Sequence, residues 1–275
     1  MAGLPRLFSL EGRTVILTGG AGLLGREYAF ALAEAGAHVA VADLRGDAAE
    51  RLAHEVTDAI GVTCVGIETD VTRKPSVQEM VQKTHALFGR VDVLVNNAAI
   101  DPTFDARSAS KRISRFEDYP LDLWNESLAV NLTGMFLCAQ AVAPLMLTAG
   151  RGVIVNVSSM YGLVGPDQRL YERSDAEPQG YKPVDYPVTK SAVLGLTRYL
   201  ATYWAGKNIR VNALTPGGVF SDHHPEFVQR YSSRVPLGRM AERAEYIGAL
   251  LFLVSDASSY MTGANLVVDG GWTAW

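Results

Sequence analysis

Short apolar runs alternate with longer amphipathic stretches along the whole chain of 275 residues. The runs are continuously apolar, a pattern typical of strands buried on both faces of a sheet. These predicted strands cover residues 14–18, 38–42, 62–69, 91–96, 153–157, 209–214 and 265–268. Helical periodicity between them predicts helices over residues 24–35, 47–59, 75–88, 121–149, 187–205 and 242–253, with Pro144 kinking or ending the long fourth helix. The alternation indicates an α/β fold with a parallel sheet covered by helices on both sides.

No linker, repeat or low-complexity segment divides the sequence, so we expect a single domain over residues 1–275. Two irregular polar insertions interrupt the alternation, near residues 101–119 and 164–183. Each follows the carboxyl end of a predicted strand, which is the edge where open α/β sheets bind ligands. Long loops at such an edge usually carry a function, such as binding a ligand. We expect both insertions to lie over a binding site.

A glycine-rich turn, Thr18-Gly19-Gly20-Ala21-Gly22-Leu23-Leu24-Gly25, joins the first predicted strand to the first predicted helix. Glycines let the backbone approach phosphate groups, and a helix N-terminus supplies N–H donors and positive potential. This order favours a doubly wound, Rossmann-type sheet with a dinucleotide site at Gly19, Gly22, Leu24 and Gly25. A tight packing turn would have a similar sequence.

Asp43 ends the second predicted strand, 18 residues after Gly25. This is close to the spacing expected of the acidic residue that binds the adenosine ribose hydroxyls. A carboxylate at this place repels a 2′-phosphate, so the sequence favours NAD over NADP. Arg45 is close enough to weaken that preference.

Composition narrows the class of protein further. A net charge of −4 and a pI near 5.8 argue against a nucleic acid or an anionic membrane as the main partner. No apolar run approaches the length of a membrane helix, and the first ten residues lack the features of a signal peptide. Cys64 and Cys138 have no metal-ligand spacing, and we expect no metal site. These observations favour a cytoplasmic protein.

Tyr186 and Lys190 lie four residues apart in Tyr186-Pro187-Val188-Thr189-Lys190, which places them on one face of a helix. A lysine ammonium beside a phenol favours the phenolate and makes the tyrosine usable as an acid or base. On its own, such a pair is usually a surface contact. Together with a dinucleotide site, it indicates hydride transfer to or from a carbonyl carbon.

The motifs around these residues resemble those of the short-chain dehydrogenase/reductase family, in its compact one-domain form. In order along the chain they are the glycine turn, Asp70-Val71, Asn96-Asn97-Ala98-Ala99, Asn131, Ser158-Ser159, Tyr186-x-x-x-Lys190, Pro216-Gly217-Gly218-Val219 and Val268-Asp269-Gly270-Gly271. The glycine turn departs from the compact pattern, because Gly22 takes its fifth position and Leu23 its sixth. This departure leaves open which backbone N–H meets which phosphate.

The resemblance implies roles for individual residues. Tyr186 would be the acid or base, with Lys190 lowering its pKa and hydrogen-bonding the nicotinamide ribose. Ser159, three residues before Gly162, would orient the substrate oxygen, and Asn131 would hold a water beside Lys190. The remaining cofactor contacts would come from Asp70 and Val71 at the adenine, Asn97 and Ala98 at the nicotinamide-side ribose, and Val219 at the carboxamide. Pro216 would also be a cofactor-binding residue.

The two insertions are rich in charged and aromatic residues, which suits a polyhydroxylated or anionic, sugar-like substrate. The residues concerned are Arg107, Lys111, Arg112, Arg115, Arg169, Tyr171, Glu172, Arg173, Asp175 and Tyr181. Solvated loop charges would have the same composition. His223 and His224 follow the Pro216-Gly217 turn, where the family carries a lid, and one of them is a candidate substrate contact.

Two other functions stay open at this point. One is an NADP-dependent biosynthetic ketoreductase, against which Asp43 speaks. The other is a dinucleotide-binding regulator without activity, against which the intact set of Asn131, Ser159, Tyr186 and Lys190 speaks. The resemblance also implies a homodimer or homotetramer, with the long helices pairing between subunits and the terminal tryptophans Trp272 and Trp275 packing on a neighbour.

Overall fold

A single parallel sheet of seven strands forms the centre of the computed structural model, which describes residues 4–101, 115–172 and 180–275. The strand order is β3-β2-β1-β4-β5-β6-β7, so the winding reverses between β1 and β4. The strands are β1 (Thr14–Thr18), β2 (His38–Asp43), β3 (Cys64–Glu68), β4 (Val93–Asn96), β5 (Gly152–Val157), β6 (Ile209–Pro216) and β7 (Asn265–Val268). This is the predicted doubly wound Rossmann-type fold, and in such folds ligands bind where the winding reverses.

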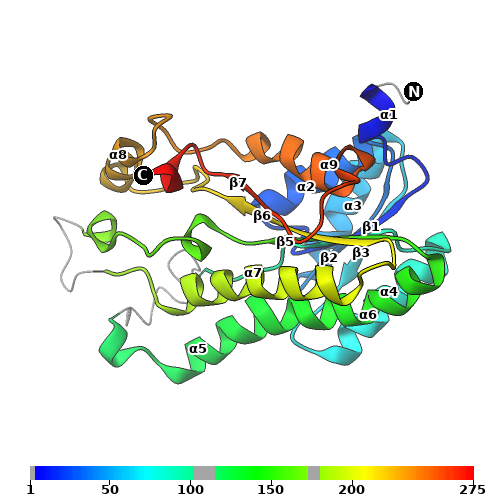
Figure 1. Ribbon diagram of the computed structural model, residues 1–275, viewed down its shortest axis with the longest axis horizontal. Coiled ribbons are helices and arrows are strands. Elements are labelled where there is room, and N and C mark those ends of the chain that lie inside the picture. The colour runs from blue at the N-terminus through cyan, green and yellow to red at the C-terminus, as the bar shows by residue number, and fades with distance from the viewer. Residues whose placement is uncertain (1–3, 102–114, 173–179) are drawn as a thin grey trace.

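Helices cover both faces of the sheet, as Figure 1 shows. One layer holds α2 (Leu23–Glu34), α3 (Gly46–Ile60) and α9 (Ile247–Val254), and the other holds α4 (Lys74–Phe88), α6 (Gly134–Ala149) and α7 (Asp185–Tyr203). Alternate strand residues point into two separate cores, one built on Leu32 and Leu250 and the other on Met80 and Val142. The central strands β1, β2, β4, β5 and β6 are therefore buried on both faces, which explains their unbroken apolar sequences, whereas the edge strands β3 and β7 are only partly buried.

Three helical elements differ from the expectation. Two short helices, α1 (Leu4–Phe8) and α8 (Pro225–Arg234), were not predicted. The long fourth helix is divided into α5 (Leu121–Leu128) and α6 by a π-helical turn at Ala129–Thr133. Pro144 lies inside α6, which continues to Ala149, so the interpretation that Pro144 ends the helix was wrong.

The run Leu121–Ala149 is also more apolar than the sequence analysis allowed. Its 29 residues have a mean hydropathy of 1.6 in the most apolar window, so by length and composition alone it would pass for a membrane helix. The chain therefore does contain an apolar stretch of about the length of a membrane helix, contrary to the expectation from the sequence. A core helix of an α/β layer has the same composition, and this one packs on α4 and on the sheet.

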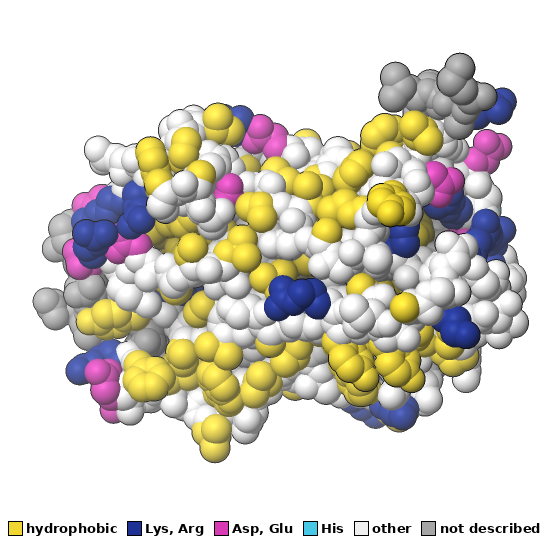
Figure 2. All heavy atoms as spheres, viewed as in Figure 1, with side chains coloured by type: hydrophobic (Ala, Val, Ile, Leu, Met, Phe, Trp, Pro, Cys, Tyr) yellow, Lys and Arg dark blue, Asp and Glu magenta, His cyan; other side chains and the backbone are white. Residues whose placement is uncertain are grey.

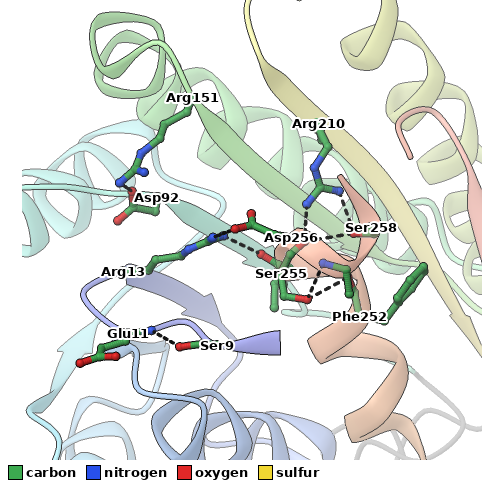
Figure 3. A network of polar contacts seen from close by, with 12 residues as sticks. Ser9, Glu11, Arg13, Asp92, Arg151, Arg210, Phe252, Ser255, Asp256 and Ser258 are labelled. Carbon is green, nitrogen blue, oxygen red and sulfur yellow. Dashed lines mark hydrogen bonds and ion pairs between the residues drawn. The ribbon is translucent and has the colours of Figure 1, made fainter. Parts of the chain in front are cut away.

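Polar contacts tie the sheet together at the amino ends of its strands (Figure 3). The guanidinium of Arg210, at the start of β6, donates to Ser258 Oγ and to the carbonyls of Leu253, Ser255 and Met261, at 2.9–3.3 Å. These carbonyls include the unpaired C-terminal end of α9, where a cation is favoured. Arg210 therefore fixes α9 to the sheet.

Replacing Arg210 with methionine should lower the free energy of unfolding by about 2–3 kcal/mol, because the carbonyls that it satisfies are partly buried. Urea unfolding of the purified chain measures the change. Arg13→Met is the matched control, since Arg13 pairs with the exposed Asp256 at 2.6 Å and makes one long contact with a helix-end carbonyl, Val254 O at 3.5 Å, so it should contribute about 1 kcal/mol. Equal losses in the two variants would contradict this account.

Candidate active site

A cleft of about 1100 Å³ opens at the carboxyl ends of the strands. It is lined by residues that follow β1, β2, β3, β4, β5 and β6, which the winding brings to one edge. The predicted site residues that line it are Gly19, Gly22, Leu24, Asp43, Asp70, Val71, Asn97, Ala98, Ser159, Tyr186, Lys190, Pro216 and Val219. Gly25 and Asn131 are not among the lining residues. Both lie beneath the cleft and shape its walls.

The glycine turn has the geometry of a phosphate cradle. Gly19 has a φ of +61°, and a Cβ there would lie 2.7 Å from Ala98 Cα. A Cβ on Gly25 would lie 2.2 Å from Gly19 O, so only glycine lets the first turn of α2 pack under the loop. Gly22 is the N-cap of α2 and offers no side-chain acceptor to the N–H groups of the first turn. A dinucleotide pyrophosphate fits this arrangement.

Asp43 supports the same turn from the end of β2. It is 9% exposed, with Oδ2 accepting from the Ala21 N–H at 3.0 Å and Oδ1 from the Arg45 N–H at 3.1 Å. The Arg45 guanidinium is largely exposed, lies 3.5 Å from the Asp43 carboxylate and donates to Ala21 O. Both a negative and a positive group therefore stand at the end of the cleft next to β2, with the carboxylate the more firmly fixed.

The next two strands contribute backbone and small polar groups. Asn97 Nδ2 donates to the carbonyls of Thr18 and Gly19, at 3.2 and 2.9 Å, so the end of β4 is tied to the glycine turn. Asp70 Oδ1 accepts from the Thr72 N–H and hydroxyl, which fixes the turn after β3. These contacts give the cleft a rigid floor before any ligand enters.

Tyr186 and Lys190 project from the first turns of α7, as predicted. Lys190 is 2% exposed, and its Nζ donates to Val157 O at 2.9 Å and lies 5.7 Å from the centre of the Tyr186 ring. Burial lowers the pKa of Lys190 to about 8, an effect that the charge of Asp101 partly opposes. Burial and the charge of Asp101 raise the pKa of the Tyr186 phenol, while a hydrogen bond with Ser159 lowers it.

The structure separates the two neighbouring serines. Ser158 Oγ donates to Lys190 O at 2.8 Å and holds α7 against β5. Ser159 caps the short turn Met160–Gly162 and is hydrogen-bonded to Tyr186. Ser159 is therefore the serine that can meet a substrate oxygen together with Tyr186.

Asn131 lies in the π turn and is fully buried. Its amide accepts from the Ile100 N–H at 2.8 Å and donates to Ile100 O and to the Thr189 hydroxyl, at 3.1 and 3.2 Å. The side chain thus joins the end of β4 to α7, directly beside Lys190. A π turn displaces the regular helical hydrogen bonds, so backbone carbonyls of the turn are the groups left to receive a water.

The sequence analysis missed one charged pair at the substrate end of the cleft. Lys182 Nζ lies 2.6 Å from Asp101 Oδ1 and also contacts Oδ2, and it lies 4.2 Å from the centre of the Tyr186 ring. Both residues line the cleft, together with Tyr161, Tyr171 and Phe227. The sequence did give two signals: both residues lie within the insertions expected over the site, and Lys182 stands four residues before Tyr186, as Lys190 stands four after it.

Among the described residues, the charged insertion side chains named from the sequence, Arg115, Arg169 and Glu172, do not line the cleft. The exposed guanidinium of Arg169 pairs with Asp167 at 2.8 Å, and that of Arg115 lies 3.8 Å from Glu117. Neither lines the cleft, which favours the alternative that these two are loop charges. His223 lines the cleft and stacks on Phe227, whereas His224 caps α8. The positions outside the described residues are Arg107, Lys111, Arg112, Arg173 and Asp175.

The described residues include no group of three or more histidine, cysteine, aspartate or glutamate side chains that could hold a metal ion. The polar groups that meet beside the glycine turn are those of Ser159, Lys182, Tyr186 and Lys190. That set of groups can hold and move a proton at a substrate oxygen.

Comparison with known proteins identifies the family. Residues 20–273 match the family described as enoyl-(acyl carrier protein) reductase. D-threitol dehydrogenase of Mycolicibacterium smegmatis is 35% identical, over 97% of this chain and 95% of its own length. The 3-oxoacyl-[acyl-carrier-protein] reductase of Thermotoga maritima is also 35% identical, over 95% of this chain and 98% of its own.

A solved structure gives the same result. The gluconate 5-dehydrogenase of Burkholderia cenocepacia, in complex with NADP and tartrate, has a TM-score of 0.86 and 30% identity, and covers 99% of this chain and 100% of its own. Fold, cleft and relatives agree along the full length of the sequence. The chain belongs to the short-chain dehydrogenase/reductase family and is an NAD(P)-dependent alcohol dehydrogenase or ketoreductase.

Proposed function

We propose that this enzyme transfers a hydride between NAD and a secondary alcohol or ketone on a polar, polyhydroxylated substrate. The observation that carries this proposal is the position of Tyr186, which is hydrogen-bonded to Ser159 and stands over Lys190 in the cleft of the glycine turn. The similarity to a D-threitol dehydrogenase supports a polyol, and the similarity to a gluconate 5-dehydrogenase supports a sugar-like skeleton.

The chain's own residues hold and move the proton. Bound NAD supplies the hydride acceptor, and Gly19, Gly22, Leu24 and Gly25 would hold its pyrophosphate. Tyr186 takes the hydroxyl proton of the alcohol at its phenolate oxygen, and Ser159 orients the substrate oxygen. Lys190 stabilises the phenolate through its charge, and the π turn of Asn131 holds a water beside Lys190. In the reducing direction Tyr186 returns the proton to the carbonyl oxygen.

NAD is the proposed cofactor because the Asp43 carboxylate is fixed by two backbone N–H groups where a 2′-phosphate would lie. Asp43→Asn keeps the acceptor toward Ala21 and removes the charge. We expect this variant to lower the ratio of kcat/KM for NAD over NADP by about tenfold, which corresponds to about 1.4 kcal/mol. A wild-type enzyme that prefers NADP would overturn the NAD proposal, in keeping with the NADP found in the Burkholderia structure.

A substrate panel tests the proposed function directly. NADH formation would be followed with polyols, sugars, sugar acids, sugar phosphates and nucleotide sugars, with NADP in parallel and Tyr186→Phe as the blank. Tyrosine-dependent turnover of polyols with NAD supports the proposal. Reduction of 3-oxoacyl thioesters with NADPH alone would favour the ketoreductase function of the Thermotoga relative, and NAD binding without any turnover would favour a regulator.

We also propose that the enzyme is a homo-oligomer in the cytoplasm. Figure 2 shows hydrophobic side chains gathered along the lower face of the molecule, over the helices α5 to α7 of Figure 1. The exposed apolar residues of these helices are Leu121, Phe136, Leu147, Val188, Tyr199 and Tyr203. Apolar surface is typical of protein–protein interaction sites, which supports the proposal that copies of the chain pair through these helices. Of the terminal tryptophans only Trp275 is exposed, since Trp272 is buried against Tyr231.

A further inference from the structure

Lys182 and Asp101 form a buried ion pair at the substrate end of the cleft. The lysine side chain is 1% exposed and the aspartate side chain 26% exposed. The two residues come from different loops, one after β4 and the other just before α7. Burying a charged pair rarely stabilises a fold more than apolar residues of the same size would. A contribution to stability therefore does not explain why the pair is present. Its position in the cleft indicates a functional role.

That position is directly beside the reacting groups. Lys182 Nζ lies 4.2 Å from the centre of the Tyr186 ring and 5.9 Å from that of Tyr161. A substrate alcohol placed at the Tyr186 hydroxyl thus has its neighbouring carbons within reach of the pair. The opposite wall is aromatic, with the hydroxyls of Tyr161 and Tyr171 joined at 3.0 Å and Phe227 packed on Tyr171.

The hydrogen-bonding groups and charges of Lys182 and Asp101 favour a neutral hydroxyl group of the substrate over an anionic one. An ammonium donates hydrogen bonds and a carboxylate accepts them, so the two together satisfy both the oxygen and the proton of a hydroxyl group. Their charges sum to zero. An anionic group on the substrate would be attracted by Lys182 and repelled by Asp101, whereas a neutral hydroxyl would gain from both.

We propose that Lys182 and Asp101 form a subsite for a hydroxyl group adjacent to the reacting carbinol, and that the substrate is a neutral polyol or sugar. This inference rests on the proposed function and narrows it, because it excludes sugar acids and sugar phosphates as the preferred substrates. The residues are specificity determinants: they bind a hydroxyl that takes no part in proton or hydride transfer.

The test compares a vicinal diol with its mono-alcohol in matched variants. Kinetics with 2,3-butanediol and 2-butanol would be measured for the wild type, for Lys182→Met and Asp101→Asn, and for the double variant, which removes both charges of the pair together. We expect the wild type to prefer the diol by at least about 100-fold in kcat/KM, since a site built around a hydroxyl rejects analogues that lack it. The double variant should lose most of this preference through a higher KM for the diol.

Two controls separate specificity from folding. Thermal unfolding and NADH fluorescence titration report whether each variant is folded and binds cofactor. Lys83→Met with Glu79→Gln removes an exposed ion pair of 2.9 Å and should leave the diol preference intact. A loss of kcat on both alcohols by the same factor would mean that Lys182 only positions Tyr186, and this result would overturn the subsite.

A preference of the wild type for gluconate over neutral polyols would overturn the proposal as well. If no alcohol is oxidised at all, the proposed function fails, and the subsite is then judged by binding. Ligand-observed NMR with NADH-saturated enzyme would show tighter binding of 2,3-butanediol than of 2-butanol if the subsite exists. Equal binding of the two would reject it.

Discussion

The Tyr186→Phe variant should oxidise the alcohol substrate with a kcat/KM about a thousandfold below that of the wild type, within the range expected for loss of an acid–base group. The substitution removes one oxygen and leaves the ring in place over Lys182 and Lys190. Because packing is preserved, the unfolding temperature and the affinity for NADH should stay close to the wild-type values. The loss should fall on kcat, since proton transfer occurs only in the reacting complex.

A second tyrosine of the same cleft provides the control. Tyr161 also lines the cleft, and burial raises its pKa to about 12. Its hydroxyl, however, is hydrogen-bonded to the hydroxyl of Tyr171. Tyr161→Phe should therefore lower kcat/KM by less than about tenfold, as expected for one lost neutral hydrogen bond. The assignment would be wrong if Tyr161→Phe were the more damaging change, or if Tyr186→Phe kept a tenth of the activity.

The fold could be predicted from the sequence because its strands are buried on both faces. Every residue of β1 and β5 is buried, so the apolar runs carry the signal without any periodicity. The helix α8 was missed because its sequence is polar and only Tyr231 is buried, although Pro225 at its first position is typical of a helix start. The π turn could not be predicted, since it follows from hydrogen bonds between Asn131 and the distant Ile100.

The residues of the candidate site were predictable where a sequence motif carries them and unpredictable where only the folded loops bring them together. Residues carried by motifs, such as Asp43 and Ser159, follow strand ends, and parallel pairing brings all strand ends to one edge. Asp101 and Lys182 belong to no motif and are 81 residues apart in the chain, so only the folded loops bring them into contact. The sequence could not decide whether Arg115 and Arg169 contact substrate or are loop charges, because composition does not show that each has a carboxylate of its own loop nearby.

Replacing Lys190 with methionine should lower kcat/KM for alcohol oxidation by about a hundredfold or more. Methionine has a similar length but neither donates to Val157 O nor carries the charge that favours the Tyr186 phenolate. The rise of the oxidation rate with pH should therefore move to higher pH in the variant. The KM for NAD should also increase, because Lys190 is the proposed partner of the nicotinamide ribose. A variant with an unchanged pH profile would show that Lys190 does not tune the tyrosine.

The same variant isolates the electrostatic effect of burying Lys190. Burial lowers the pKa of Lys190 from 10.5 to about 8, so between these pH values the unfolded chain binds a proton that the folded chain lacks. The free energy of unfolding contributed by Lys190 must then rise with pH, by roughly 2 kcal/mol between pH 7.5 and 9.5. Urea unfolding of cofactor-free wild type and Lys190→Met over this interval measures the difference, and stopping below pH 10 keeps tyrosine ionisation out of it. If the difference in the free energy of unfolding between the two proteins did not change with pH, Lys190 would have an ordinary pKa. Its cation would then be as well solvated in the folded chain as in water.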